Sequence, residues 1–417
     1  MAPSSERLVN RSLVHRASGS LFLRALPAVY GAALILLVVR VLPLGDFGRY
    51  GMAIAYVNLI AAMSRGLWIV PLVIHGARGG HRDFQGPALW LSLATALLGA
   101  ALGQVILPLL GVGRQLALIA AIMQITLVPR DVAIGLLQSG QRAWSAFWVE
   151  AGYFLGSLAG FAVLFAVGRL TSAEAALTAN LCAAILSTLI AFAYEPGLLS
   201  VGLRGNWKGT FQLGRWVGLL ALGELFLQQG DVLLVGAFFS AEAIAPYIAA
   251  RTLLRMYGLL SQAVNFLVLP SASRLGAGGQ MAVLRSRLRK ILLFMMVVLL
   301  PVNIVMWLIS PWFFPLLLGV KYIPAIPFFR ILILATFCEP VYSVLTNALA
   351  GIGKTWVPVP VLGISLIVNV VLNVILLPTF GLTSAAIVLV TTYAVLAFGS
   401  YRMGKKHLDV SALPPIT

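Results

Sequence analysis

Long apolar runs separated by short polar connections dominate this chain. A helix of roughly 20 mostly apolar residues is long enough to cross the ~30 Å hydrocarbon core of a bilayer. The pattern therefore predicts an all-α integral membrane protein with about twelve transmembrane helices. The predicted spans are 20–42, 50–74, 88–110, 116–137, 146–167, 173–194, 216–239, 244–269, 291–312, 325–350, 356–377 and 381–401.

The composition supports the membrane class. Hydrophobic residues make up 60% of the 417 residues, charged residues 10%, and the mean hydropathy is +0.99. The net charge of +17 resembles that of a nucleic-acid-binding protein, but the basic residues lie between apolar runs and not on one soluble face. We therefore expect no nucleic-acid partner. The two cysteines, Cys182 and Cys338, lie inside apolar runs and predict neither a disulfide framework nor a metal site.

The basic residues also predict the orientation. If the N-terminus is cytoplasmic, seventeen of them fall in cytoplasmic segments and at most five on the opposite side. The positive-inside rule then places both termini in the cytoplasm, with residues 1–19 and 402–417 as tails. The run 20–42 is too long for the apolar region of a signal peptide, so we expect it to remain as the first span.

Short sequence matches predict two homologous halves. Leu137–Trp144 aligns with Leu349–Trp356, and Leu170–Ala173 aligns with Leu382–Ala385, both at an offset of about 210 residues. We therefore predict two six-helix lobes, 20–194 and 214–401, joined by a cytoplasmic linker at 195–213. Each lobe begins on the same side, so the repeats are parallel, an arrangement in which the substrate site lies between the halves.

Ionisable residues within predicted spans are the candidate functional groups, because a charge at membrane depth is costly. In the seventh span, Glu224 and Asp231 share one helix face with Gln228. In the eighth, Arg251 and Arg255 share a face, and the short connection lets Asp231 and Arg251 meet at similar depth. That pair could couple transport to an ion, or it could be a structural bridge between helices.

Further deep charges lie in the first half. Arg65 lies deep in the second span, and Arg24 lies near the inner end of the first, where it could also extend to the interface. We interpret Asp131 as a local partner of Arg130, and Glu150 as a residue near the start of its helix. The deep charges are basic in sum, which favours a water-filled cationic cavity. A guanidinium group can bind two phosphate oxygens through parallel hydrogen bonds, so such a cavity suits a pyrophosphate head group.

Motifs spread over about residues 17–407 resemble the Wzx-type polysaccharide and O-antigen flippases of the multidrug/oligosaccharidyl-lipid/polysaccharide (MOP) exporter superfamily. They lie near the first outer turn, after the eighth span, before the tenth and eleventh spans, and near the end of the chain. The segments are Arg40–Tyr50, Pro270–Ser273, Gly319–Ala325, Leu349–Lys354 and Pro378–Ala386. Ser384 stands where the family usually has glycine.

The resemblance implies a V-shaped bundle of two six-helix lobes that works by alternating access across the bacterial cytoplasmic membrane. It implies an undecaprenyl-pyrophosphate-linked oligosaccharide as substrate and a proton or sodium gradient as driver, with no cofactor. Arg24, Arg65, Arg251 and Arg255 match the arginine-bearing spans of related lipid II flippases. Besides membrane lipids, a polymerase and a chain-length regulator of the same polysaccharide pathway are the implied partners.

Three alternatives remain. A lipid II flippase usually has fourteen spans, more than this chain supplies comfortably. A cation-coupled drug exporter of the same superfamily would need an acidic cavity, which the deep arginines disfavour. A membrane glycosyltransferase or polymerase would need a sizeable outer domain, but the longest predicted outer connection is 313–324. We therefore expect a transporter and not an enzyme.

Overall fold

The computed structural model describes residues 35–76, 81–140, 142–354 and 356–408, and this part of the chain is helical without strands. The prediction of an all-α fold is confirmed. By its internal contacts the chain divides into two compact units, the first ending at Ala245 and the second beginning at Pro246. Helix α10 (Ala241–Ala277) contains this boundary.

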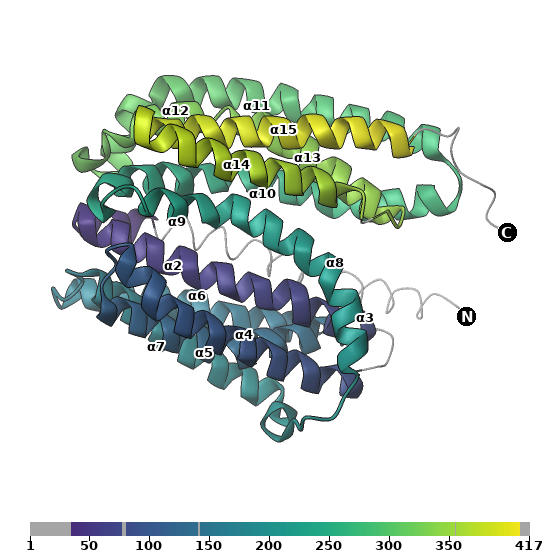
Figure 1. Ribbon diagram of the computed structural model, residues 1–417, viewed down its shortest axis with the longest axis horizontal. Coiled ribbons are helices and arrows are strands. Elements are labelled where there is room, and N and C mark those ends of the chain that lie inside the picture. The colour runs from purple at the N-terminus through teal and green to yellow at the C-terminus, as the bar shows by residue number, and fades with distance from the viewer. Residues whose placement is uncertain (1–34, 77–80, 141, 355, 409–417) are drawn as a thin grey trace, which may run out of the picture. The chain divides into compact units, whose positions relative to one another are not determined.

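The first unit contains helices α2 to α9, coloured purple through teal in Figure 1. Two π-helical turns, η2 and η4, interrupt long helices of this unit. The elements are η1 (Ile35–Val39), α2 (Leu44–Ser64), η2 (Arg65–Ile69), α3 (Val70–Gly76), α4 (His81–Leu109), α5 (Arg114–Ser139), α6 (Ala143–Ala166), α7 (Ala173–Tyr194), η3 (Pro196–Ser200), α8 (Trp207–Leu225), η4 (Phe226–Gly230) and α9 (Asp231–Gly236).

The second unit contains most of α10 and the helices that follow it, coloured green to yellow in Figure 1. The elements are α11 (Met281–Leu318), η5 (Val320–Tyr322), α12 (Ala325–Leu332), α13 (Ala335–Gly351), α14 (Pro358–Phe380) and α15 (Thr383–Leu408). A buried apolar cluster that includes Val268, Met295, Val344 and Leu408 holds α10, α11, α13 and α15 together.

Among the described residues, nine helices are long and apolar enough to cross a membrane, or ten if α12 and α13 form one span. These two helices meet at 41°, so the predicted span 325–350 is broken and not continuous. The predicted first span, 20–42, lies mostly outside the described residues. The predicted eighth span lies in α10, which is not among the nine. The total of twelve therefore stays a prediction.

Glycines with positive φ precede the matched segments in both sequence halves. Gly168 (φ 66°) follows α6, and Gly381 (φ 69°) follows α14. This backbone conformation strongly favours glycine. The matched segments at 170–173 and 382–385 lie at the starts of α7 and α15. The two lobes and their boundary at 195–213 stay predictions.

The seventh predicted span packs in the first unit. Adding a Cβ to Gly236 in α9 would place it 2.6 Å from the sulfur of Met52, and a Cβ on Gly48 would lie 1.8 Å from the carbonyl oxygen of Ala241. Backbones approach closely at such glycines, as is common between membrane helices. The first compact unit therefore extends to Ala245, beyond the predicted linker.

Helices α6 and α7 are also joined through small residues. A Cβ on Gly156 would lie 3.3 Å from the Cβ of Ala183, and one on Gly160 would lie 3.1 Å from the Cβ of Ala179. One turn further along, Gly152 faces the backbone of Ser187. This close packing lets the Ser187 hydroxyl donate to the carbonyl of Val149 at 2.6 Å.

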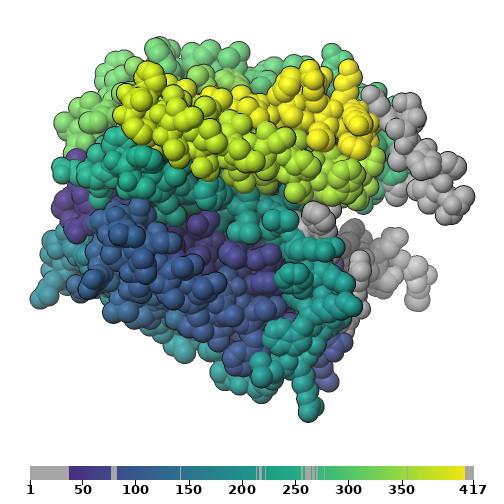
Figure 2. Space-filling model, viewed as in Figure 1, coloured from purple at the N-terminus to yellow at the C-terminus, as the bar shows by residue number. Residues whose placement is uncertain are grey.

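Large apolar side chains are exposed along α14, as expected for a helix that faces lipid. Ile364, Ile367 and Ile375 are each more than half exposed. Figure 2 shows α14 and α15 at the surface of the second unit.

Candidate functional site

The π-helical turn η2 positions Arg65 inside a membrane-spanning helix. The apolar helix runs from Leu44 to Gly76, and Arg65 lies about three turns before its end. Its side chain is 50% exposed. Turns of the π type within α-helices occur frequently at functional sites. A half-exposed guanidinium at this depth calls for either an internal partner or an anionic ligand.

Three neighbouring helices hold the η2 turn in place. The Trp68 indole donates to the hydroxyl of Thr95 in α4 at 2.8 Å and stacks on Phe211 of α8, with ring centroids 6.3 Å apart. A Cβ on Gly135 of α5 would lie 2.5 Å from a methyl group of Ile69. The turn is therefore fixed against α4, α5 and α8.

The contact with α8 is the tightest of these. A Cβ on Gly214 would lie 2.0 Å from the carbonyl oxygen of Leu67, and one on Gly218 would lie 2.2 Å from its side chain. These two glycines are spaced by four residues and form one face of α8. Only glycine allows this approach, so the sequence of α8 fixes the backbone beside Arg65.

A cluster of charged residues lies next to Arg65. The Oδ2 atom of Asp131 in α5 lies 3.7 Å from the Nε of Arg65. Its Oδ1 atom accepts a 2.7 Å hydrogen bond from Arg130. Arg130 also forms an ion pair with Glu150 of α6. We call Arg65, Arg130, Asp131 and Glu150 the charge cluster. It contains two guanidinium groups and two carboxylates, and so balances in charge.

Arg130 is the most enclosed member of the charge cluster. Its side chain is 6% exposed, and its Nε donates to the hydroxyl of Ser187 in α7 at 3.0 Å. Its guanidinium carbon lies 5.0 Å from the ring centroid of Tyr153. All three nitrogens of this side chain have partners, as a buried arginine requires.

The other predicted site residues have different surroundings. Asp231 is 1% exposed and begins α9 directly after the π-helical turn η4, and Glu224 is half-buried in α8. Arg251 is 3% exposed in α10. Arg24 lies outside the described residues, and Arg255 belongs to α10 but its side chain is outside the described part. The pairing of Asp231 with Arg251 stays a prediction.

The sequence interpretation missed the extent of the charge cluster. Arg130 and Asp131 are a local pair, as predicted, but they also connect α5 to η2, α6 and α7. Glu150 lies two turns inside α6 and not at its start. A sequence signal existed, since three ionisable residues fall within two consecutive apolar spans, where charges usually pair. The spacing alone could not show that α5 and α6 bring them together.

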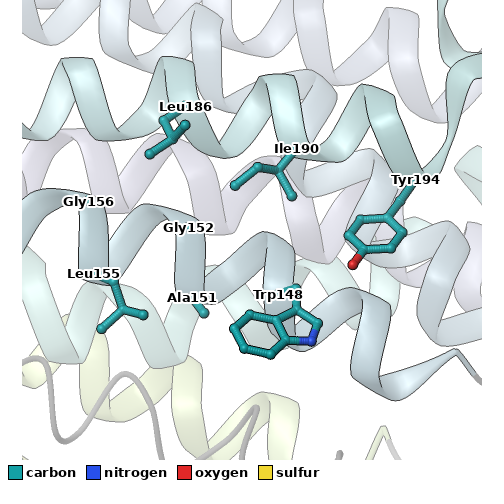
Figure 3. A pocket seen from close by; sticks show the side chains of 8 residues that line it. All are labelled: Trp148, Ala151, Gly152, Leu155, Gly156, Leu186, Ile190 and Tyr194. Carbon is teal, nitrogen blue, oxygen red and sulfur yellow. The ribbon is translucent and has the colours of Figure 1, made fainter.

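An open apolar groove lies elsewhere on the first unit, between α6 and α7 (Figure 3). Its volume is about 340 Å³. Trp148, Leu155 and Ile190 line it together with Ala151, Gly152, Gly156, Leu186 and Tyr194. The lining carries no charged side chain, so the groove offers no cationic group to an anionic ligand. The charge cluster is therefore the candidate functional site.

The sequence profile of the family described as polysaccharide biosynthesis protein matches residues 37–327, well over half of the chain. This chain belongs to the polysaccharide biosynthesis protein family. The predicted resemblance to polysaccharide flippases of the MOP superfamily is confirmed at this level. Both the charge cluster and the η2 turn fall within the matched region.

Two curated relatives of this family member are archaeal. An uncharacterised membrane protein of Methanocaldococcus jannaschii is 27% identical over 206 residues, which are 49% of this chain and 40% of the relative. A protein of Haloferax volcanii named as a probable low-salt glycan biosynthesis flippase is 22% identical over 190 residues, 46% of this chain and 40% of the relative. The matched segment thus spans less than half the length of these relatives.

Solved structures confirm the fold class. A structure titled as the lipid II flippase MurJ in an inward closed conformation has a TM-score of 0.74 and 15% identity, over 94% of this chain and 87% of the other. A structure of an inward-facing multidrug transporter of the MATE family, in the MOP superfamily, has a TM-score of 0.72 and 14% identity. The match covers 93% of this chain and 98% of the other. At such identities the likeness shows the fold and not the substrate.

Proposed function

We propose that this family member is a flippase that moves a polyprenyl-pyrophosphate-linked oligosaccharide across the cytoplasmic membrane by ion-coupled alternating access. The observation that supports the proposal most is the position of Arg65. Its guanidinium is half exposed inside a spanning helix, on a turn that three helices hold in place. A fixed guanidinium is well suited to phosphate oxygens, which it can bind through two parallel hydrogen bonds.

The terminal nitrogens of Arg65 are available for such a ligand. The Nε atom of Arg65 lies 3.7 Å from Asp131, and neither Nη1 nor Nη2 has a hydrogen-bond partner within the part of the chain that the structure describes. We propose Arg24, Arg251 and Arg255 as further phosphate-binding residues, on the sequence evidence alone. Several guanidinium groups can share the charge of a pyrophosphate, which one cannot neutralise.

We propose Asp231 as the ion-coupling residue, with Glu224 as the second candidate. Asp231 is almost completely buried and follows the π-helical turn η4, a type of turn that occurs frequently at functional sites. A buried carboxylate that takes up a proton or sodium ion in one state of the cycle would link transport to the gradient.

We also propose that both termini lie in the cytoplasm. A polymerase and a chain-length regulator of the same pathway are the proposed protein partners.

The substrate class can be tested with purified protein in liposomes. We expect translocation of a fluorescent prenyl-pyrophosphate oligosaccharide when an ion gradient is imposed, and no transport of a lipophilic cationic dye. Empty liposomes and liposomes without a gradient are the controls. Transport of the dye with no movement of the lipid-linked sugar would favour a cation-coupled drug exporter instead.

A further inference from the structure

Asp131 presents its two carboxylate oxygens to two different arginines. Its Oδ1 accepts a hydrogen bond from Arg130 at 2.7 Å, and its Oδ2 lies 3.7 Å from the Nε of Arg65. The Asp131 side chain is 9% exposed, whereas that of Arg65 is 50% exposed. A single carboxylate thus connects a buried arginine to one that can reach a ligand.

Arg130 keeps this carboxylate in place. Its remaining nitrogens bind Ser187 of α7 and Glu150 of α6. Because its partners come from two further helices, Arg130 cannot follow Arg65 if that side chain moves. Asp131 is therefore a fixed negative charge beside the proposed phosphate-binding group.

We propose that Asp131 competes with the anionic head group for Arg65 and is a positioning residue of the phosphate site. When no ligand is bound, the Asp131 carboxylate attracts the Arg65 guanidinium and keeps it beside the charge cluster. When phosphate oxygens bind, two anions share one guanidinium, and their repulsion lowers the affinity. A transporter needs such a limit, because a ligand that binds too tightly is released slowly.

The inference rests on the proposed function, since it requires an anionic group at Arg65. A competing role and a purely structural role for Asp131 predict opposite changes in ligand affinity when the carboxylate is removed. Loss of a structural carboxylate would weaken ligand binding or leave it unchanged. Loss of a competing carboxylate strengthens binding, and only when Arg65 is present.

Glu150 provides the matched control for this effect. Both carboxylates bind Arg130, but only Asp131 approaches Arg65 among the described residues. Asp131→Asn and Glu150→Gln each remove one negative charge and leave Arg130 with one carboxylate partner. A general effect of charge or stability would therefore appear in both variants.

The experiment measures the binding of geranyl pyrophosphate to the purified full-length chain in detergent, by calorimetry at fixed pH and ionic strength. We expect Asp131→Asn to tighten binding about three- to tenfold, the size of a moderate electrostatic coupling. Glu150→Gln, which removes a carboxylate that forms no ion pair with Arg65 among the described residues, should not tighten binding, and the difference between the two variants is the effect to be measured. In the Arg65→Ala background, Asp131→Asn should produce no further gain.

The possible results separate the two claims. If Arg65→Ala weakens binding but Asp131→Asn does not tighten it, the competition is wrong and the proposed phosphate site stands. If Asp131→Asn tightens binding equally without Arg65, the competition is also wrong. If Arg65→Ala binds like the unmodified protein, both claims fail. Thermal unfolding checks each variant, and Asp131→Ser replaces Asp131→Asn if the latter does not fold.

Discussion

Arg130 of α5 and Glu150 of α6, separated by 20 residues in the chain, form an ion pair with side chains only 6% and 15% exposed. Arg130 also neutralises Asp131, so one guanidinium serves two carboxylates inside the first unit. Removing one partner from a buried pair leaves an uncompensated charge, which costs far more than losing an exposed pair.

We therefore expect Arg130→Ala to lower the free energy of unfolding by about 3–5 kcal/mol, because both carboxylates lose their shared partner. Denaturant unfolding in detergent micelles measures the change. The control is Arg142→Ala, which removes an ion pair with Glu195 whose side chains are 49% and 25% exposed. That change should cost no more than about 1 kcal/mol. Equal losses in the two variants would contradict a stabilising role of the charge cluster.

A second prediction concerns the support of the η2 turn. In Gly214→Ala, the new methyl group would lie 2.0 Å from the Leu67 carbonyl oxygen, so α8 must move away from η2. We expect a destabilisation of about 1–3 kcal/mol, typical of overpacking, together with weaker pyrophosphate binding. The control, Gly363→Ala in α14, meets no atom within 4 Å and should be neutral or slightly stabilising. Unchanged stability and binding in Gly214→Ala would show that this contact is not required.

The orientation can be tested by cysteine labelling. The basic segment at the start of α11 contains Arg285, Arg287, Arg289 and Lys290, which the positive-inside rule places in the cytoplasm. We expect single-cysteine variants at Ser286 and Ser12 to resist an impermeant thiol reagent in intact cells and to react after permeabilisation. The background would lack the native Cys182 and Cys338. Labelling of intact cells at either position would reverse the proposed orientation.

The coupling role of Asp231 gives a fourth prediction. Asp231→Asn keeps the size of the side chain but removes its charge, so we expect it to abolish gradient-driven transport while substrate binding changes little. Transport in liposomes with and without an imposed gradient distinguishes the two effects. Glu224→Gln is the parallel variant and should retain coupling. Full coupling in Asp231→Asn with a loss in Glu224→Gln would transfer the role to Glu224.

The sequence predicted the helical fold well, because membrane helices leave a direct length and polarity signal. The break between α12 and α13 was not predicted. No proline or glycine lies at residues 333–334, where the two helices join.

The candidate site was predicted only in part. Arg65 was identified from its depth, which depends on the sequence of one helix. Its relation to Asp131, Arg130 and Glu150 depends on the side-by-side packing of η2, α5 and α6, which glycines such as Gly135 permit. Contacts between helices do not follow from the periodicity of any one of them. For that reason Glu150 was interpreted as an interface residue when it lies in the charge cluster.

The central claim is that Arg65 binds the phosphates of a lipid-linked substrate during transport. The most direct measurement is the rate of translocation of a prenyl-pyrophosphate oligosaccharide by purified variants in liposomes, together with its binding affinity. We expect Arg65→Ala, and likewise Arg255→Ala, to weaken binding by about 1.5–3 kcal/mol and to slow translocation. Arg65→Lys keeps the charge without the paired hydrogen bonds and should recover only part of the loss. The control Arg49→Ala removes a guanidinium near the start of the same helix, where it pairs with Asp46, and should transport normally. Normal affinity and a normal rate in both Arg65→Ala and Arg255→Ala would contradict the account.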